Sequence, residues 1–125
     1  MNPQQVIARR RAEQAALIAR AERFAQTLAG ELGVDAVVVF GSVARGDFND
    51  CSDIDVLVVA EHLPQRALDR FAVLGDPPDP VRPVAWTPAE WRHERRRANP
   101  IAVEALEHGV WLQGPPQALD VSPDG

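Results

Sequence analysis

Two short runs of β-branched and other apolar residues constrain the fold of this 125-residue chain more than any other feature. The first run, residues 34–40, contains three consecutive valines before Phe40, and the second, residues 53–60, is apolar apart from two aspartates. Such runs predict buried strands, because β-branched side chains pack well on a pleated sheet. A third strand is predicted over residues 81–86, where Pro83 favours the edge of the sheet.

The segments around these strands have helical patterns. An apolar stripe at helical spacing runs through residues 4–32, and two glycines are expected to end this helix. Between the second and third strands, a shorter helix is expected to turn Leu68, Phe71 and Leu74 toward the core. A threonine, a proline and a glutamate at positions 87, 88 and 90 form a capping box, which begins the next helix. Helices are therefore predicted over residues 4–32, 64–74, 87–98 and 99–109, and a last short strand over 110–112.

Together these elements predict an α/β (α+β) fold, in which helices flank a small mixed sheet. The length suits one domain, assigned to residues 1–113. The segment 114–125 contains three prolines and is expected to be a disordered tail.

Composition narrows the classes of function. The single cysteine excludes an internal disulfide and fits a reducing compartment, and no apolar run is long enough to cross a membrane, so we expect a cytoplasmic protein without a membrane partner. The formal net charge of -5 argues against direct nucleic-acid binding. The arginine clusters at 9–11 and 92–97 are interpreted as solvated helix faces, with a contact to a partner or to phosphates as the alternative.

Two aspartates, Asp53 and Asp55, stand within the second predicted strand. Side chains alternate along a strand, so both carboxylates point to the same face, about 6.6 Å apart at a rise of ~3.3 Å per residue. Two like charges side by side are costly unless a cation neutralises them. Carboxylate oxygens favour Mg²⁺ or a similar hard cation, whose coordination phosphate oxygens can complete. The alternative is a strand end at the surface, where both aspartates are simply solvated.

Gly41-Ser42 directly follows the first predicted strand. Glycine allows positive φ and close approach of the backbone. Successive N–H groups in such a turn form an anion-binding concavity, and a helix beginning at Ser42 or Val43 would add a favourable dipole for a phosphate. The alternative is an ordinary strand-to-helix turn, so the dipeptide alone is a weak indication.

The two features combine into Gly-Ser-x10-Asp-x-Asp. This pattern resembles the signature of the DNA polymerase β-like nucleotidyltransferase superfamily. The likeness to its minimal nucleotidyltransferases also covers residues 81–91 and 104–112. The segments that resemble those proteins within the motif are Ala44-Arg45-Gly46-Asp47 and Ser52-Asp53-Ile54-Asp55.

The resemblance implies a role for each matching residue. Gly41 and Ser42 would hold the β- and γ-phosphates of a nucleoside triphosphate, and Arg45 lies where it could reach a phosphate. Asp53 and Asp55 would bind Mg²⁺ and carry the catalysis, with ATP as the substrate. A surface position without a ligand is the alternative for Arg45.

One position departs from the family's pattern. Active members carry a third carboxylate on the next strand, and the matching position here is Arg82. An arginine is a permanent cation and cannot bind a metal, but it can pair with an aspartate or with a triphosphate. Asp79, three residues upstream, becomes the third metal ligand if the strand register differs. The departure bears on catalysis rather than on nucleotide or metal binding.

Three functions fit this sequence. The first is transfer of AMP from ATP to a hydroxyl group. Small stand-alone proteins that resemble this chain are antitoxins paired with a HEPN-domain toxin, whose hydroxyl receives the AMP. The second is a binding module of the same fold that neutralises its partner by contact alone, in keeping with Arg82. The third is a transferase for small molecules such as aminoglycosides, acting as a homo-oligomer.

Overall fold

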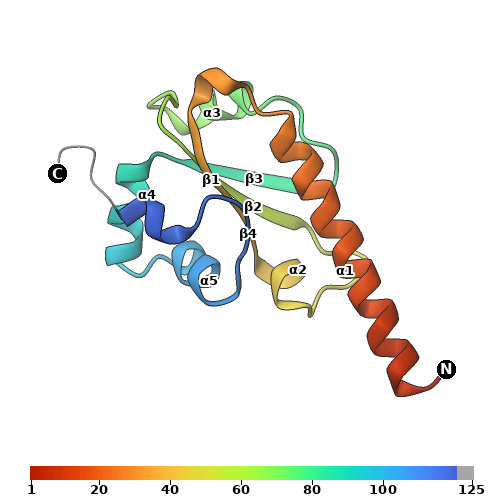
Figure 1. Ribbon diagram of the computed structural model, residues 1–125. Helices are drawn as coiled ribbons and strands as arrows, with labels where there is room; N and C mark the ends of the chain where they lie inside the picture. The colour runs from red at the N-terminus through yellow and green to blue at the C-terminus, as the bar shows by residue number, and fades with distance from the viewer. Residues whose placement is uncertain (121–125) are drawn as a thin grey trace.

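A four-stranded mixed sheet lies at the centre of the molecule (Figure 1), which we describe from a computed structural model for residues 1–120. The strand order is β3-β2-β1-β4, with β1 antiparallel to β2 and β4, and β2 parallel to β3. The predicted fold class is therefore confirmed. The elements are α1 (Pro3–Gln26), η1 (Gly30–Leu32), β1 (Val34–Phe40), α2 (Gly41–Arg45), β2 (Ile54–Ala60), α3 (Ala67–Val73), β3 (Val81–Trp86), α4 (Pro88–Arg96), α5 (Pro100–His108), β4 (Val110–Gln113) and η2 (Pro116–Asp120).

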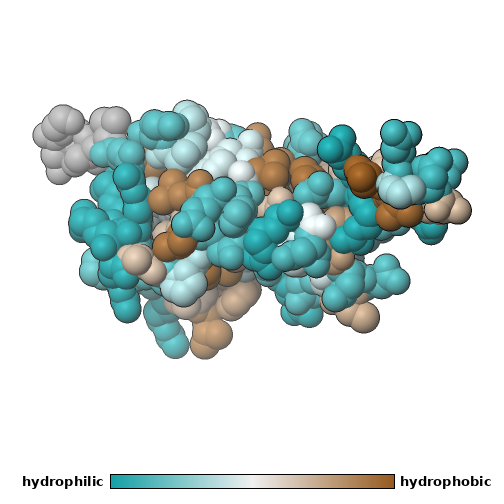
Figure 2. Space-filling model, turned by 90° about the horizontal axis from the view of Figure 1, so that it is seen from below, coloured by the Kyte–Doolittle hydropathy of each residue, from teal (hydrophilic) through white to brown (hydrophobic). Residues whose placement is uncertain are grey.

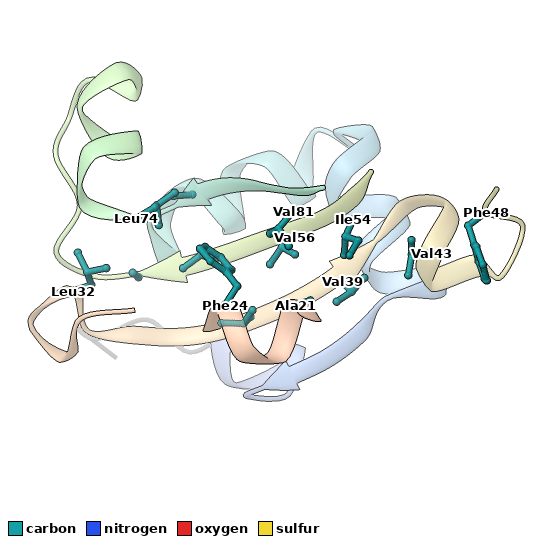
Figure 3. Close-up of a cluster of buried hydrophobic side chains, with 14 residues drawn as sticks. Ala21, Phe24, Leu32, Val39, Val43, Phe48, Ile54, Val56, Leu74 and Val81 are labelled. Carbon is teal, nitrogen blue, oxygen red and sulfur yellow. The ribbon is translucent and has the colours of Figure 1, made fainter. Parts of the chain in front are cut away.

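Both faces of the sheet are covered, and this explains the unbroken apolar runs of β1 and β2. Alternate residues of each strand enter different cores. On one face, Val39 and Val56 pack against Ala21 and Phe24 of α1 (Figure 3). On the other face, Leu57 and its neighbours pack against α4, α5 and η2. The buried residues of this second core are Ala36, Val38, Phe40, Leu57, Val59, Trp91, Ala102, Ala105 and Leu119.

The long N-terminal helix is shorter than predicted. α1 ends at Gln26, where the Thr27 hydroxyl donates to the Phe24 carbonyl at 2.6 Å, and residues 30–32 form a separate 3-10 turn. The apolar stripe continues through this turn because Leu32 is also buried, so the periodicity did not reveal the break. The first turns of α1 extend beyond the sheet (Figure 1), and hydrophobic side chains gather at that end of the surface (Figure 2), where Ile7 is exposed.

The helix between β2 and β3 faces the core differently from the prediction. The expected inner residues Leu68 and Phe71 are 73% and 59% exposed, whereas Leu74 and Arg70 are buried. Arg70 takes an inner position because its guanidinium donates to the carbonyls of Pro64 at 2.6 Å and Ala85 at 3.0 Å. The same guanidinium donates to Glu90 of α4 at 2.7 Å, so a satisfied cation occupies the place assigned to apolar side chains. Pro83 lies on the edge strand β3, as predicted.

The expected disorder after Gly114 does not hold for the residues that the structure describes. Residues 116–120 form η2, and Leu119 is 2% exposed within the second core. The segment η2 that carries this side chain packs against α4 and β1. The prolines in the segment had favoured disorder, so this packing was not predicted. Residues 121–125 lie outside the described part of the chain. Within residues 1–120, no helix is both long enough and apolar enough to cross a membrane.

Glu90 makes stability depend on pH. Burial alone would raise the pKa of Glu90, but hydrogen bonds from Arg70 and Thr87 outweigh burial and lower it. A lowered folded-state pKa adds stability above the unfolded value of 4.5, and this stability disappears as the pH falls through the folded-state pKa. Glu90→Gln keeps the acceptor oxygen and removes the charge. We expect it to lower the free energy of unfolding at pH 7 by less than about 1 kcal/mol, because the side chain is 44% exposed.

Urea titrations of parent and Glu90→Gln at pH 7 and pH 3 check this prediction. The difference between the two proteins should be smaller at pH 3 than at pH 7. Glu22→Gln serves as the control because Glu22 is an exposed glutamate of α1. An equal loss at both pH values would contradict a charge effect.

Candidate functional site

Three neighbouring strands bring the predicted residues to one end of the sheet. Phe40 at the end of β1 is opposite Asp55 in β2, and Asp55 is opposite Arg82 in β3. Ile54 and Val56 enter the core under α1, so alternation turns Asp55 to the face covered by α4 and α5. Asp53 precedes the first residue of β2 and is exposed. Helix α2 begins at Gly41, directly after Phe40, so the start of α2 and the two aspartates are adjacent in space.

Gly41 lies so close to Asp55 that any other side chain would displace the Asp55 carboxylate. Its φ is +75°, and a Cβ atom built on it would be 2.4 Å from Asp55 Oδ2. The backbone after β1 and the carboxylate of β2 therefore share one wall of an open cavity of about 260 Å³. The residues lining this cavity are Phe40, Gly41, Ser42, Arg45, Asp55, Pro100, Ile101 and Glu104. The predicted phosphate loop and one predicted metal ligand thus face the same space.

The electrostatics of this cavity favour a bound cation. Burial raises the pKa of Asp55 above its usual range, and the charges of Asp53 and Glu104 raise it further. The Arg45 charge lowers the same pKa and only partly offsets these effects. A raised carboxylate pKa means that the surroundings do not fully neutralise the negative charge of the ionised form. A cation between the two aspartates would neutralise it.

Glu104 is a residue of the cavity to which sequence analysis assigned no role. Arg45 Nη1 donates to Glu104 Oε2 at 2.8 Å, and Arg45 Nε donates to Asp47 Oδ2 at 3.2 Å. Arg45 and Glu104 are 59 residues apart in the sequence, and only the packing of α5 beside α2 brings them together. No local spacing signals such a contact. The guanidinium of Arg45 is consequently held at the cavity wall, near the loop that is predicted to bind phosphate.

Arg82, and not Asp79, lies opposite Asp55. Arg82 Nε is 3.5 Å from Asp53 Oδ1, with the two side chains 65% and 50% exposed. Among residues 1–120, no group of three or more His, Cys, Asp or Glu side chains lies close enough together to hold a metal ion. Asp79 therefore does not join Asp53 and Asp55 in a three-carboxylate site. The structure pairs the first aspartate with an arginine instead.

Two side chains of α1 fix the loop that joins α2 to β2. Arg10 donates to the carbonyls of Gly46 at 3.1 Å and Phe48 at 2.6 Å, and its guanidinium stacks 4.0 Å from the centre of the Phe48 ring. Gln14 donates to the Val43 carbonyl at 2.8 Å. One member of the first arginine cluster is thus a structural anchor of the site rather than a solvated charge.

Comparison with known proteins agrees with this geometry. A family model described as a nucleotidyltransferase domain matches residues 18–112, which include the whole of the sheet except the last residue of β4. The chain belongs to the nucleotidyltransferase domain family. This match confirms the resemblance drawn from Gly-Ser-x10-Asp-x-Asp.

Two curated relatives of this nucleotidyltransferase come from Methanocaldococcus jannaschii. The one named "Putative protein adenylyltransferase MJ1305" is 42% identical over 57 residues, which are 44% of this chain and 39% of the relative. "Putative protein adenylyltransferase MJ0141" is 48% identical over 31 residues, 25% of this chain and 31% of the relative. The chain thus matches well under half of the length of either relative.

A solved structure shares the fold of this nucleotidyltransferase. The crystal structure of "a putative nucleotidyltransferase" from Sulfolobus solfataricus superposes with a TM-score of 0.60 and 23% sequence identity. The superposition covers 82% of this chain and 84% of that one. At this identity the likeness establishes the fold.

The side chains at this site fit a divalent cation. Asp53 and Asp55 offer only oxygen donors, and Asp55 carries an incompletely compensated charge. Magnesium is commonly held by one or two carboxylates together with phosphate oxygens and water. Two carboxylates beside the predicted phosphate-binding residues Gly41 and Ser42 would therefore be a sufficient protein contribution.

Gly41→Ala tests the close approach of the loop to Asp55. Positive φ costs a non-glycine residue about 1–2 kcal/mol, and the new Cβ would also push the Asp55 carboxylate away. We expect a loss of stability and a loss of nucleotide binding. Gly75→Ala is the matched control, since Gly75 has a φ of +83° but open space around it. In thermal melts with and without Mg²⁺-ATP, Gly75→Ala should lose stability only through its positive φ and should keep the nucleotide-dependent shift in melting temperature. Equal behaviour of the two variants would contradict a role for the contact.

Proposed function

We propose that this nucleotidyltransferase-family protein transfers AMP from Mg²⁺-bound ATP to a hydroxyl group of another protein. The observation that carries the proposal is the contact between Gly41 and Asp55, which joins a phosphate loop to a carboxylate pair. Gly41, Ser42 and Arg45 line the cavity in which the β- and γ-phosphates would lie. Asp55 lines the same space, and the charge of Asp53 acts on Asp55 from beside it. The family assignment supports the reaction class.

The transfer step needs positioning and charge neutralisation from the protein. The acceptor oxygen forms a bond to the α-phosphorus, the bond from that phosphorus to the bridging oxygen breaks, and pyrophosphate leaves with the electron pair. The hydroxyl proton passes to a nearby carboxylate or to water. The magnesium ion, when bound, would neutralise charge on the phosphates. Gly41 and Ser42 would orient the leaving pyrophosphate, while Arg45, fixed by Glu104, would add a positive charge beside it.

A protein is the acceptor that the relatives favour, because both are named protein adenylyltransferases. The resemblance to antitoxins of the minimal nucleotidyltransferase class makes a HEPN-domain toxin the proposed acceptor. AMP on a toxin hydroxyl would neutralise the toxin, and incubation of the two proteins with labelled ATP and Mg²⁺ followed by mass spectrometry would detect it.

Arg82 favours a second candidate function. A guanidinium within 3.5 Å of Asp53 partly replaces a metal ion and offers no base to the acceptor. A protein with this arrangement can bind a nucleotide and a partner without turnover. In that case neutralisation of the partner would require contact alone.

Mg²⁺-ATP is expected to raise the melting temperature of the protein. A ligand at ten times its Kd that binds only the folded state adds about 1.4 kcal/mol of stability, which corresponds to about 5 °C for a domain of this size. Differential scanning fluorimetry with millimolar Mg²⁺-ATP measures the shift, with ATP plus EDTA and Mg²⁺ alone as controls. An unchanged melting temperature would exclude a working nucleotide site and with it the transfer function, and would leave neutralisation by contact alone.

A further inference from the structure

A groove runs along the outer edge of β3, on the side away from β2. Two depressions, of about 450 Å³ and about 110 Å³, share Phe71 and Pro83 in their walls and are therefore adjoining. Together they extend from Ala85 to Asp79, between β3 and α3. In the part of the chain that the structure describes, β3 is the last strand of the sheet, so this edge of its backbone has no partner strand.

The walls of the groove are apolar and accessible. Phe71 of α3 is 59% exposed and lines both depressions. The proline of β3 and the buried side chain of Leu74 complete the apolar wall. The Ala85 carbonyl on β3 already accepts from Arg70, the Val81 N–H donates to Pro78, and Pro83 has no N–H, so a ligand would find few free backbone groups here. Two adjoining depressions with an exposed aromatic side chain between them suit an extended peptide that packs its side chains along the groove.

One end of the groove reaches the candidate site. Arg82 lines the larger depression and also lies 3.5 Å from Asp53. Across the sheet, Phe40 at the end of β1 lies beside Asp55 of β2, and Asp55 lies beside Arg82 of β3. Gly41 follows Phe40, so the order is Gly41, Asp55, Arg82. The phosphate cavity and the groove are consequently on opposite sides of the aspartates. Because the attacking and leaving oxygens of phosphoryl transfer are roughly in line, the acceptor must approach from the side opposite the leaving pyrophosphate. That side is the β3 groove.

The charge at the reactive end indicates the chemistry of the occupant. Asp76 and Asp79 are both exposed and line the larger depression, where Arg82 is the single cation of the lining. Two carboxylates against one guanidinium leave a net negative end, which attracts a basic side chain and disfavours an acidic one.

We propose that the β3 groove binds an extended segment of the acceptor protein, with an apolar side chain against Phe71 and a basic side chain beside Asp76 and Asp79. This places the acceptor hydroxyl near Asp53. The inference rests on the proposed transfer function and adds the surface that selects the acceptor.

A designed peptide tests the groove. The probe is a fluorescein-labelled nine-residue peptide of alternating valine and lysine around a central tyrosine, and its binding to the full chain is followed by fluorescence anisotropy. Phe71→Asp should weaken binding at least ten-fold, since it puts a charge where an apolar side chain packs. Ile7→Asp is the matched control, because Ile7 is equally exposed but lies on the protruding turns of α1. It should leave binding unchanged. A peptide with glutamate in place of lysine should bind at least ten-fold more weakly.

Three results would overturn the inference. These are no binding of the lysine peptide, equal binding by Phe71→Asp, or equal binding of the glutamate peptide. Sedimentation of the parent as a dimer that Phe71→Asp dissociates would also overturn it, because a second copy would then fill the groove. The Mg²⁺-ATP melting shift is measured on the same samples. If Mg²⁺-ATP does not raise the melting temperature but the lysine peptide still binds more tightly than the glutamate peptide, the transfer function is refuted and the groove is not. If Mg²⁺-ATP raises the melting temperature but the two peptides bind equally, the groove alone is refuted.

Discussion

Asp55→Asn is expected to lower nucleotidyl transfer at least about a hundred-fold while leaving the protein folded. The substitution removes a carboxylate that faces the cavity proposed to hold the phosphates. Charge stabilisation of this kind is worth several kcal/mol, and each 1.36 kcal/mol equals a factor of ten in rate. With water or an added protein as the hydroxyl acceptor, release of pyrophosphate from ATP measures the rate. Isothermal titration with Mg²⁺-ATP should show a parallel loss of metal-dependent binding.

The same substitution should slightly stabilise the protein in the absence of metal. Burial and the charge of Asp53 raise the pKa of Asp55, so ionised Asp55 opposes folding at neutral pH. An amide relieves this repulsion. Asp50→Asn is the matched control, because Asp50 is an exposed aspartate in the loop before β2 and lies outside the phosphate cavity. A destabilised Asp55→Asn, or an Asp50→Asn variant with the same loss of transfer, would show that the effect is on the fold.

The sheet and the motif could be predicted because their signals are local. The β-branched runs of β1 and β2 admit few structures other than buried strands, and the capping box at Thr87 is present as expected. Asp53 and Asp55 could be placed beside Gly41 only because the motif as a whole was recognised. Spacing by itself left a solvated strand end as an equal alternative, and the close approach of Gly41 to Asp55 in the structure favours the shared site.

The remaining features depend on contacts between distant segments. Arg70 takes an inner position because carbonyls of two other segments accept its hydrogen bonds, so Leu68 and Phe71 turn outward. Glu104 enters the site through the packing of α5, and Leu119 is buried although prolines precede it. In each case a polar group is hydrogen-bonded, or an apolar group is buried, by residues far away in the sequence. The periodicity of the sequence does not predict such contacts.

Arg82→Asp is expected to convert the site into a three-carboxylate centre. The exposed pair with Asp53 contributes at most about 1 kcal/mol, so its loss alone should cost little stability. The new carboxylate lies opposite Asp55 in the register and beside Asp53, and the added repulsion should destabilise the metal-free protein. Mg²⁺ relieves that repulsion, so the melting temperature should depend more strongly on Mg²⁺ than in the parent.

The effect of Arg82→Asp on turnover separates an enzyme from a binding module. A third carboxylate can hold metal and accept the acceptor's proton. Pyrophosphate release should therefore rise at least about ten-fold, since a well-placed general base contributes about a hundred-fold or more. Arg82→Ala is the control, since it removes the cation without adding a ligand and should weaken triphosphate binding without raising the rate. The contrary result is a parent that transfers AMP rapidly and loses this activity on Asp79→Asn. Asp79 would then reach the metal during turnover although it lies outside any acidic cluster among residues 1–120, and Arg82 would serve to bind the triphosphate.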